Sequence, residues 1–287
     1  MIYELPLERR TLHGHFSREL EPVAAVDPGD TIGFACLNAG WRSETEEQFE
    51  PRDPELDSGH ALIGPVEVRG ARAGQTLVVR IGSVRPGSWG TTLGNGASYD
   101  WDLAAGRGVM RQRREVAVEL RPFLGVLGMP PPAPGRHSTI PPRAWGGNID
   151  CKELVAGTTL YLPIPVDGAF FSAGDGHARQ GDGEVSGTAI ECPLARAELT
   201  LDLRDDLRLE TPLARTGDAW LAFGFDEDLD RAADQATEAM LGLLRRERGI
   251  GRSEALALAS VVVDLRVTQV VNEVKGIHAI LADDALR

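Results

Sequence analysis

The sequence predicts a mainly β protein of the sandwich or jelly-roll type, with a possible internal duplication and a smaller C-terminal α+β portion. Glycine and proline, at 33 and 18 of 287 residues, make up about 18% of the chain. This share exceeds the usual value of about 12% and indicates many turns. Short runs that alternate apolar and polar residues occur through the first two hundred positions, which is the period of a strand with one buried face. Apolar residues at helical spacing occur only after residue 228.

Four strands are predicted from this alternation, over residues 77–81, 116–120, 160–164 and 199–203. The last run is the clearest, because leucine stands at positions 199, 201 and 203 with polar residues between.

A Gly-x-Thr-aliphatic pattern recurs at 29–32, 74–77 and 157–160. Each copy would be a glycine turn that enters a strand. The recurrence indicates either a duplicated β unit or a chance repetition of common turn chemistry.

The chain is expected to divide into two halves. Six prolines between residues 129 and 145 oppose regular strand pairing, so this stretch is either a linker or one wall of a cleft. We expect a β-rich N-terminal half over residues 1–140. The C-terminal half, over residues 141–287, would hold an acidic, glycine-rich loop and the terminal helices.

Two helices are predicted in the C-terminal portion. Apolar residues over 229–244 lie on one helical face, with Asp226 as the N-cap and Gly249 as the stop. A second helix is expected from about 254 to 264, with Ser253 as its cap. Its end stays open, because the β-branched residues that follow suit a strand.

Charge and composition exclude several classes of protein. The chain carries 30 basic and 43 acidic residues, a net charge of −13, which argues against binding to nucleic acid or to anionic membranes. No apolar run is long enough to span a membrane, and the first ten residues lack the features of a signal peptide. Cys36, Cys151 and Cys192 are odd in number and widely spaced, as expected of reduced thiols. We therefore expect a cytoplasmic protein.

The densest polar cluster is the glycine-rich stretch 174–184, which follows an apolar run and contains Asp175, His177, Asp182 and Glu184. Asp175 and His177 would point to the same side of an extended strand. Carboxylates with a neutral imidazole form an ordinary zinc ligand set, which other divalent ions also accept. The alternative is a surface loop whose charges are solvated.

A second polar cluster follows a Gly-Gly pair, where Asn148 and Asp150 alternate and can face one side. Cys151 is a poor candidate nucleophile, because no neighbouring histidine supports a thiolate. Asp150 is the better candidate, as a ligand or a base. His15 and His60, each beside a glycine, are weaker candidates that could be structural. No phosphate-binding glycine loop and no G-x-S-x-G motif occurs.

These residues carry a resemblance to a known family. The stretches that resemble the acetamidase/formamidase family are 146–150, 154–163 and 174–191, together with 26–31, 59–66 and 264–272. The resemblance spans nearly the whole chain. It implies hydrolysis of short amides, such as formamide or acetamide, to ammonia and a carboxylate. It also implies a mostly β fold, a bound divalent metal and homo-oligomers.

The metal would be zinc, with calcium as the alternative. As ligands we assign Asp150, Asp175 and His177, with His60 or His15 completing the set. A bound divalent metal would lower the pKa of a water molecule to about 7 and polarise the amide carbonyl.

The catalytic residues would be Glu184, Asp182, Asn148 and Gln180, all within the stretches that resemble the family. Glu184 would act as general base toward water and then as acid toward ammonia. Asn148 or Gln180 would orient the substrate amide.

The expected partners are a small amide substrate and further copies of this chain, in a homodimer or a higher homo-oligomer. Two alternatives remain open. One is a hydrolase that acts on a lactam or a larger amide. The other is a noncatalytic β-sandwich that binds a metal or a small ligand. The complete set of acids around the histidine favours an enzyme.

Overall fold

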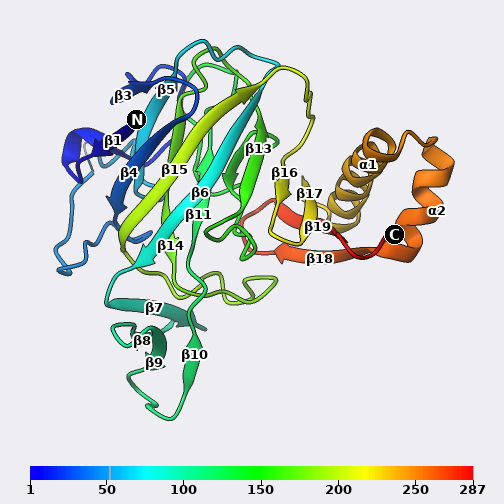
Figure 1. Ribbon diagram of the computed structural model, residues 1–287. Coiled ribbons are helices and arrows are strands. Elements are labelled where there is room, and N and C mark those ends of the chain that lie inside the picture. The colour runs from blue at the N-terminus through cyan, green and yellow to red at the C-terminus, as the bar shows by residue number, and fades with distance from the viewer. Residues whose placement is uncertain (52, 287) are drawn as a thin grey trace.

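Three β-sheets form most of the computed structural model, which describes residues 1–51 and 53–286 (Figure 1). The largest sheet has nine strands, in the order β1 (Ile2–Leu5), β4 (Asp30–Cys36), β15 (Leu194–Arg204), β6 (Thr76–Pro86), β13 (Thr159–Pro163), β16 (Leu213–Arg215), β17 (Ala219–Asp226), β19 (Lys275–Ala282) and β18 (Val263–Gln269). This architecture confirms the predicted fold class.

The second sheet has six strands, and one of them carries Asp175 and His177. Its order is β12 (Gly146–Asn148), β11 (Phe123–Gly128), β14 (Phe171–His177), β5 (Leu62–Val68) and β2 (Leu12–His13), with β3 (Ala24–Val26) parallel to β5. A short 3₁₀ helix, Arg9–Thr11, precedes β2. The third sheet has four strands, in the order β10 (Ala117–Glu119), β9 (Arg107–Met110), β8 (Ala97–Asp102) and β7 (Trp89–Gly94), and extends away from the other two (Figure 1).

The nine-stranded and six-stranded sheets share one hydrophobic core. Buried residues of both sheets belong to a single cluster, which includes Val79, Leu160 and Leu199 from the larger sheet and Ile63, Leu124 and Phe171 from the smaller one. Burial of a side chain of this size stabilises the fold by about 1.5–3 kcal/mol. Two sheets around a shared apolar layer are a β-sandwich.

The predicted strands are found where the alternation is strongest. Residues 77–81 lie within β6 and residues 199–203 within β15, and these two strands pair with each other. Residues 160–163 lie within β13. The run at 116–120 forms only the three-residue strand β10, at the edge of the four-stranded sheet.

The proline-rich stretch 129–145 connects two strands of the same sheet, because β11 and β12 pair antiparallel with Leu127 opposite Gly147. Part of the stretch, from Pro142 to Trp145, lines a cavity of about 640 Å³, as the cleft-wall interpretation expects. Strands from both sides of residue 140 alternate within the large sheet, in the order β15-β6-β13. The division at residue 140 stays a prediction.

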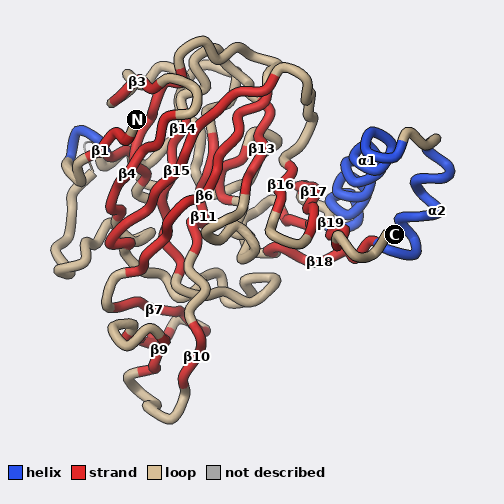
Figure 2. The backbone as a smooth tube through the Cα atoms, viewed as in Figure 1, coloured by secondary structure: helices blue, strands red, loops and turns tan. Residues whose placement is uncertain are grey.

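Two helices follow β17 and lie beside one end of the large sheet (Figure 2). Helix α1 (Leu229–Arg248) buries Met240, Leu243 and Leu244 against Ile277 and neighbouring residues of the sheet, in a second, smaller core. Helix α2 (Arg252–Val262) leads directly into β18. No helix of the described residues is long and apolar enough to cross a membrane.

The predicted stop of α1 is confirmed, but both predicted N-caps are wrong. Gly249 has a left-handed backbone (φ 65°) and donates its N–H to the carbonyl of Arg245. Asp228, rather than Asp226, caps α1 by accepting the N–H groups of residues 230 and 231. Helix α2 begins after Gly251, so Ser253 lies inside its first turn. Two acidic residues so close together cannot be ranked as caps from sequence alone.

The cap of α1 gives a stability prediction. We expect Asp228→Ala to lower the free energy of unfolding by about 1 kcal/mol, because two backbone N–H groups lose their acceptor. Thermal or urea denaturation measures the change. The control is Ser253→Ala, which removes no capping bond and should stay within about 0.5 kcal/mol of the wild type. An equal loss in both variants would contradict the cap at Asp228.

Candidate active site

Strand β14 places Asp175 and His177 beside Gly125 of the neighbouring strand β11. A Cβ atom at Gly125 would lie 2.3 Å from Oδ2 of Asp175, 2.6 Å from Oδ1 of Asp150 and 2.8 Å from Cε1 of His177. These distances are too short for any side chain. Gly125 therefore leaves the space into which two carboxylates and the imidazole converge.

Three further acids come from loops that surround β14. Asp150 follows β12, Glu184 lies in the loop after β14, and Glu191 precedes β15 and forms a backbone bridge with His177. The five side chains, which we call the acidic cluster, are all buried: Asp150, Asp175, His177, Glu184 and Glu191. His177 and Asp150 are each only 1% exposed.

The imidazole of His177 is the centre of this cluster. Its Nε2 lies 3.3 Å from Oδ2 of Asp175 and 3.2 Å from Oε2 of Glu191. Its Nδ1 lies 3.9 Å from Oδ1 of Asp150. The ring packs edge-on against Phe123, with 4.9 Å between the ring centroids. The sequence prediction that Asp175 and His177 point to the same side of a strand thus agrees with their contact.

Three of the four acids have a strained backbone. Asp150, Asp175 and Glu184 have φ values of 51°, 61° and 46°, in the left-handed region that residues with a side chain rarely adopt. Each such residue costs about 1–3 kcal/mol and persists only where surrounding contacts impose it. Strain of this kind concentrates at functional sites.

Mutual repulsion and burial perturb the acids of the cluster. Burial, reinforced by the charge of Glu184, raises the pKa of Asp150 well above its usual range. Burial also raises the pKa of Glu184 to about 7, although the charge of His177 opposes the shift. The pKa of Glu191 is raised as well, again chiefly by burial.

Asp175 and His177 behave as an ion pair instead. Burial raises the pKa of Asp175, but the charges of His177 and His60 outweigh it and leave this pKa below its usual value. Burial lowers the pKa of His177, yet Glu191 and Asp175 outweigh it, so the net shift is well upward. Even with a protonated imidazole, the cluster holds more carboxylates than cationic groups.

Many polar atoms of the site have no hydrogen-bond partner. Among the described residues, eleven buried side-chain atoms are unpartnered, and seven of them belong to Asn148, Asp150, Asp175, His177, Gln180, Glu184 and Glu191. Such atoms are rare in folded proteins, because each one loses its hydration without a replacement. Their concentration indicates a site that is completed by a ligand.

The residues fit a divalent metal. Two groups with metal-ligand spacing share His177: one with Asp175 and Glu191, the other with Asp150 and Glu184. In tetrahedral zinc sites the bonds to nitrogen and oxygen are about 2.0–2.2 Å long, so neighbouring ligand atoms lie about 3.4 Å apart. The atoms of Asp175, His177 and Glu191 match this spacing more closely than the 3.9 Å pair.

Two residues of the site were not predicted. Glu191 contacts His177, and its other oxygen accepts the N–H of Ala189 at 2.8 Å. Asn272 donates from Nδ2 to Oδ2 of Asp150 at 2.5 Å. Each residue ends a stretch that resembles the acetamidase/formamidase family, at 174–191 and 264–272. That was the available signal, but the site residues that Glu191 and Asn272 contact, His177 and Asp150, are not their neighbours in sequence.

The structure brings some of the other predicted residues to the cluster and not others. Gln180 donates from Nε2 to the backbone oxygen of Asp150 at 2.7 Å. His15 is held by Asp57, 2.8 Å away. The ring of His60 contacts the Thr139 hydroxyl at 2.9 Å. Neither histidine belongs to a group with metal-ligand spacing among the described residues.

Asp182 and Cys151 lie just outside the cluster. Asp182 is ion-paired with Arg266 and Lys152. Cys151 is 1% exposed, and burial raises the pKa of its thiol far above the usual value. A thiol in this state stays protonated, which agrees with the prediction that Cys151 is a poor nucleophile.

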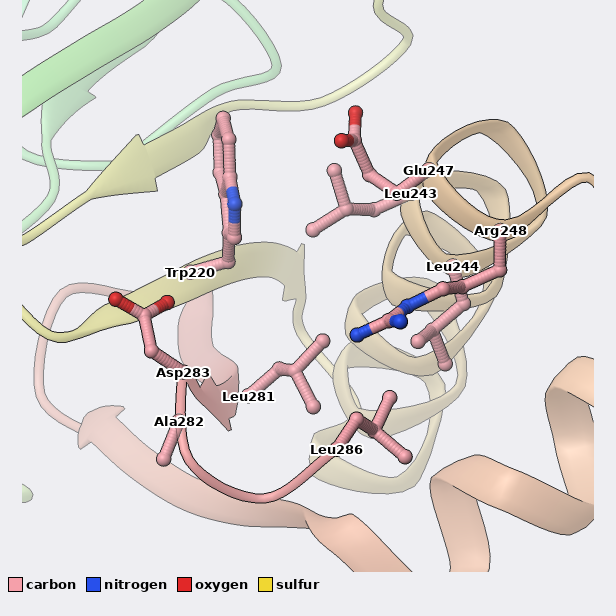
Figure 3. Close-up of a pocket in the computed structure, with 9 residues that line it drawn as sticks. All are labelled: Trp220, Leu243, Leu244, Glu247, Arg248, Leu281, Ala282, Asp283 and Leu286. Carbon is pink, nitrogen blue, oxygen red and sulfur yellow. The ribbon is translucent and has the colours of Figure 1, made fainter.

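A surface cavity elsewhere is not part of this site. It has a volume of about 200 Å³ and lies between Trp220 and Leu281 of the sheet and Leu243 and Arg248 of α1 (Figure 3). None of its lining residues belongs to the acidic cluster.

The fold and the site together define a β-sandwich protein with a buried centre of four carboxylates around one imidazole. The model of the Acetamidase/Formamidase family matches residues 4–134 and 132–282. The chain belongs to this family, which confirms the resemblance found in the sequence. The match falls in two segments, which supports the predicted internal duplication.

Individual relatives agree with the family. The chain is 28% identical over 245 residues to the formamidase of Methylophilus methylotrophus, with 61% of this chain and 60% of that enzyme covered, so it spans less than two thirds of that relative. The crystal structure of acetamidase from Bacillus halodurans has a TM-score of 0.86 at 27% identity and covers 98% of this chain and 97% of that one. The crystal structure of a protein described as a predicted acetamidase/formamidase from Thermoanaerobacter tengcongensis has a TM-score of 0.87 at 25% identity, with 100% of this chain and 97% of that one covered. The predicted type of enzyme, an amidohydrolase of linear amides, is confirmed.

Proposed function

We propose that this protein hydrolyses short linear amides, such as formamide or acetamide, to ammonia and a carboxylate with the help of a bound divalent metal. The observation that carries the proposal is the acidic cluster, in which five buried polar atoms have no hydrogen-bond partner, with two more on Asn148 and Gln180, in a member of the Acetamidase/Formamidase family. We propose zinc as the metal, because imidazole with carboxylates is an ordinary zinc ligand set. Calcium prefers six to eight oxygen ligands, whereas each candidate ligand group around His177 offers one imidazole nitrogen and two carboxylates.

The metal would be held by Asp175, His177 through Nε2, and Glu191. This assignment keeps Asp175 and His177 from the predicted ligands, takes Asp150 out of the set, and replaces the predicted His60 or His15 by Glu191. It rests on the distances of 3.3 and 3.2 Å from Nε2 of His177 to the oxygens of Asp175 and Glu191. It also rests on charge, because two carboxylates would neutralise a divalent ion in a buried site.

Asp150 would orient the imidazole rather than bind the metal. Its Oδ1 faces Nδ1 of His177, and both atoms lack a hydrogen bond in this structure. Histidine ligands usually donate their second N–H to a carboxylate, which fixes the tautomer and the direction of the ring. Asn272 and Gln180 hold Asp150 in place for this contact.

Glu184 would move the proton. Its Oε2 is buried without a partner, and its pKa of about 7 suits a group that must take up and release a proton near neutral pH. As a carboxylate it would accept a proton from the attacking water. As a carboxylic acid it would then protonate the departing nitrogen, which leaves as ammonia.

When bound, the metal would supply a lowered pKa for water and polarisation of the amide carbonyl. The chain itself would orient the amide nitrogen. A primary amide offers two N–H donors, and two buried side-chain oxygens outside the acidic cluster have no partner: Oδ1 of Asn148, two residues before Asp150, and Oε1 of Gln180. Oε1 of Gln180 is free to accept, because Nε2 is used on the backbone of residue 150. Asp182 is ion-paired with Lys152 and Arg266. It would therefore contribute indirectly, through the residues around it, and not by contact with the substrate.

We also propose that the protein is cytoplasmic and that it forms homo-oligomers. The three cysteines, Cys36, Cys151 and Cys192, are buried and free, as expected in the reducing cytoplasm. Assembly into a homodimer or a higher homo-oligomer remains a proposal from the family resemblance, which sedimentation of the purified protein would test.

The direct test measures ammonia released from formamide and acetamide by purified protein, before chelation, after chelation, and after return of zinc or calcium. We expect release that is lost with the metal and restored by zinc. Release that persists after complete metal removal would contradict metal dependence. No release from either amide with zinc present would contradict the proposed substrates and favour a lactam, a larger amide or a binding role.

A further inference from the structure

We propose that Arg266 is a positioning residue, which bridges the two loops that carry Asp150 and Glu184 and fixes both for catalysis. The proposal rests on the function proposed above. Arg266 lies on β18, far from these loops in sequence, and its ion pairs within the described residues are with Asp182 and Glu153, not with the acidic cluster. Its effect would pass through two carboxylates, Asp182 and Glu153.

The guanidinium of Arg266 holds both carboxylates at once. Nε and Nη2 lie 2.9 and 2.5 Å from Oδ2 of Asp182, and Nη1 lies 2.9 Å from Oε1 of Glu153. A planar guanidinium with five donors suits this arrangement, whereas a lysine ammonium cannot reproduce it. Lys152 also contacts Asp182, and Arg121 also contacts Glu153. Of the described residues, Arg266 alone is ion-paired with both acids.

Each of these carboxylates lies a short distance along the chain from a member of the acidic cluster. Asp182 precedes Glu184 by two residues, and Glu153 follows Asp150 by three. Asp150 and Glu184 are two of the residues with a strained, left-handed backbone. Such conformations need contacts that hold the flanking chain in place. Arg266 supplies one such contact to each loop.

The backbone around Arg266 binds the same loops. The N–H of Gly183 donates to the carbonyl of Thr268, and the N–H of Val270 donates to the carbonyl of Gly183, each at 3.1 Å. Asn272, a few residues further on, donates to Asp150. The segment 266–272 therefore joins the C-terminal part of the chain to the site. Within it, Arg266 is the side chain that ties the two loops to each other.

The bridge should position the two loops more than it stabilises the fold. The side chains of Arg266 and Asp182 are 35% and 29% exposed, and exposed ion pairs add little to the free energy of folding. Glu153 is only 9% exposed, but it keeps its pair with Arg121 when Arg266 is removed. Misplacement of a catalytic group by about 1 Å can nevertheless lower turnover about 100-fold. Loss of Arg266 should thus affect catalysis more than folding.

The test compares Arg266→Ala and Arg266→Lys with the control Arg215→Ala. Arg215 makes a comparable pair with Asp283, 2.6 Å away on the same sheet, and its side chain is 29% exposed. Amide hydrogen exchange of the loops around residues 150–153 and 181–187 is measured in each full-length protein, together with kcat and KM for acetamide. The exchange measurement does not depend on any catalytic activity.

We expect Arg266→Ala to speed exchange in both loops and to lower kcat about 10–100-fold while KM changes little. Arg266→Lys should be intermediate, and added guanidinium ion should partly restore kcat of the alanine variant. Arg215→Ala should change neither the loops nor kcat. Unchanged exchange in either loop, or an unchanged kcat with faster exchange, would overturn the proposal. Absence of amide hydrolysis by the wild type would refute the proposed function instead, and the exchange result would still decide whether Arg266 bridges the loops.

Discussion

Glu184→Gln should lower the turnover of short amides by about 10²–10⁴-fold, the usual contribution of a general acid or base. Glutamine keeps the size of the side chain but cannot accept a proton from water or pass one to the departing nitrogen. Glu184 is suited to this role because its carboxylate is buried, has an unpartnered oxygen and has a pKa raised to about 7. Steady-state kinetics with acetamide measures the loss.

The same variant should keep its metal, because Glu184 is not among the proposed ligands. Elemental analysis of the purified protein gives the metal content. A matched control is Glu247→Gln, which makes the same chemical change on the surface of α1 and should leave turnover unchanged. Wild-type turnover in Glu184→Gln would remove this residue from the mechanism. Loss of the metal would instead make it a ligand.

Glu191→Gln should also lose turnover, but through loss of the metal. Glutamine lacks the negative charge that a divalent ion needs, so the affinity for zinc should fall by more than the roughly 10–100-fold that loss of an outer hydrogen-bond partner costs. Turnover should fall with it and recover in part at high zinc concentration. Competition with a chelating dye measures the affinity, independently of any substrate.

The comparison of these two variants distinguishes the two possible ligand sets. Asp150→Asn provides a third measurement, because the proposal places Asp150 behind the imidazole and predicts only the smaller loss of affinity that an outer partner causes. The alternative set has Asp150 and Glu184 as ligands with His177. It would be favoured if Asp150→Asn and Glu184→Gln release zinc while Glu191→Gln retains it.

Local sequence patterns predicted much of the fold. The alternation at 199–203 places a row of leucines on the buried face of β15, because side chains along a strand alternate between its two faces. The helical face from residue 229 onward and the stop at Gly249 were also predictable, since they depend on neighbours within a few positions. The choice between Asp226 and Asp228 as cap was not, because the sequence does not fix where the preceding strand ends.

Within the site, the sequence by itself determined the pair Asp175 and His177, since residues two positions apart on one strand lie on the same face. Only the tertiary structure decided the partners of that pair. Glu191 reaches His177 because the chain returns to the end of β14 before β15 begins and forms an antiparallel backbone bridge there. Asn272 reaches Asp150 across 122 positions, because β18 and the turn after it dock on the site loops. Contacts of this kind depend on the packing of whole sheets, and no local pattern of residues encodes them.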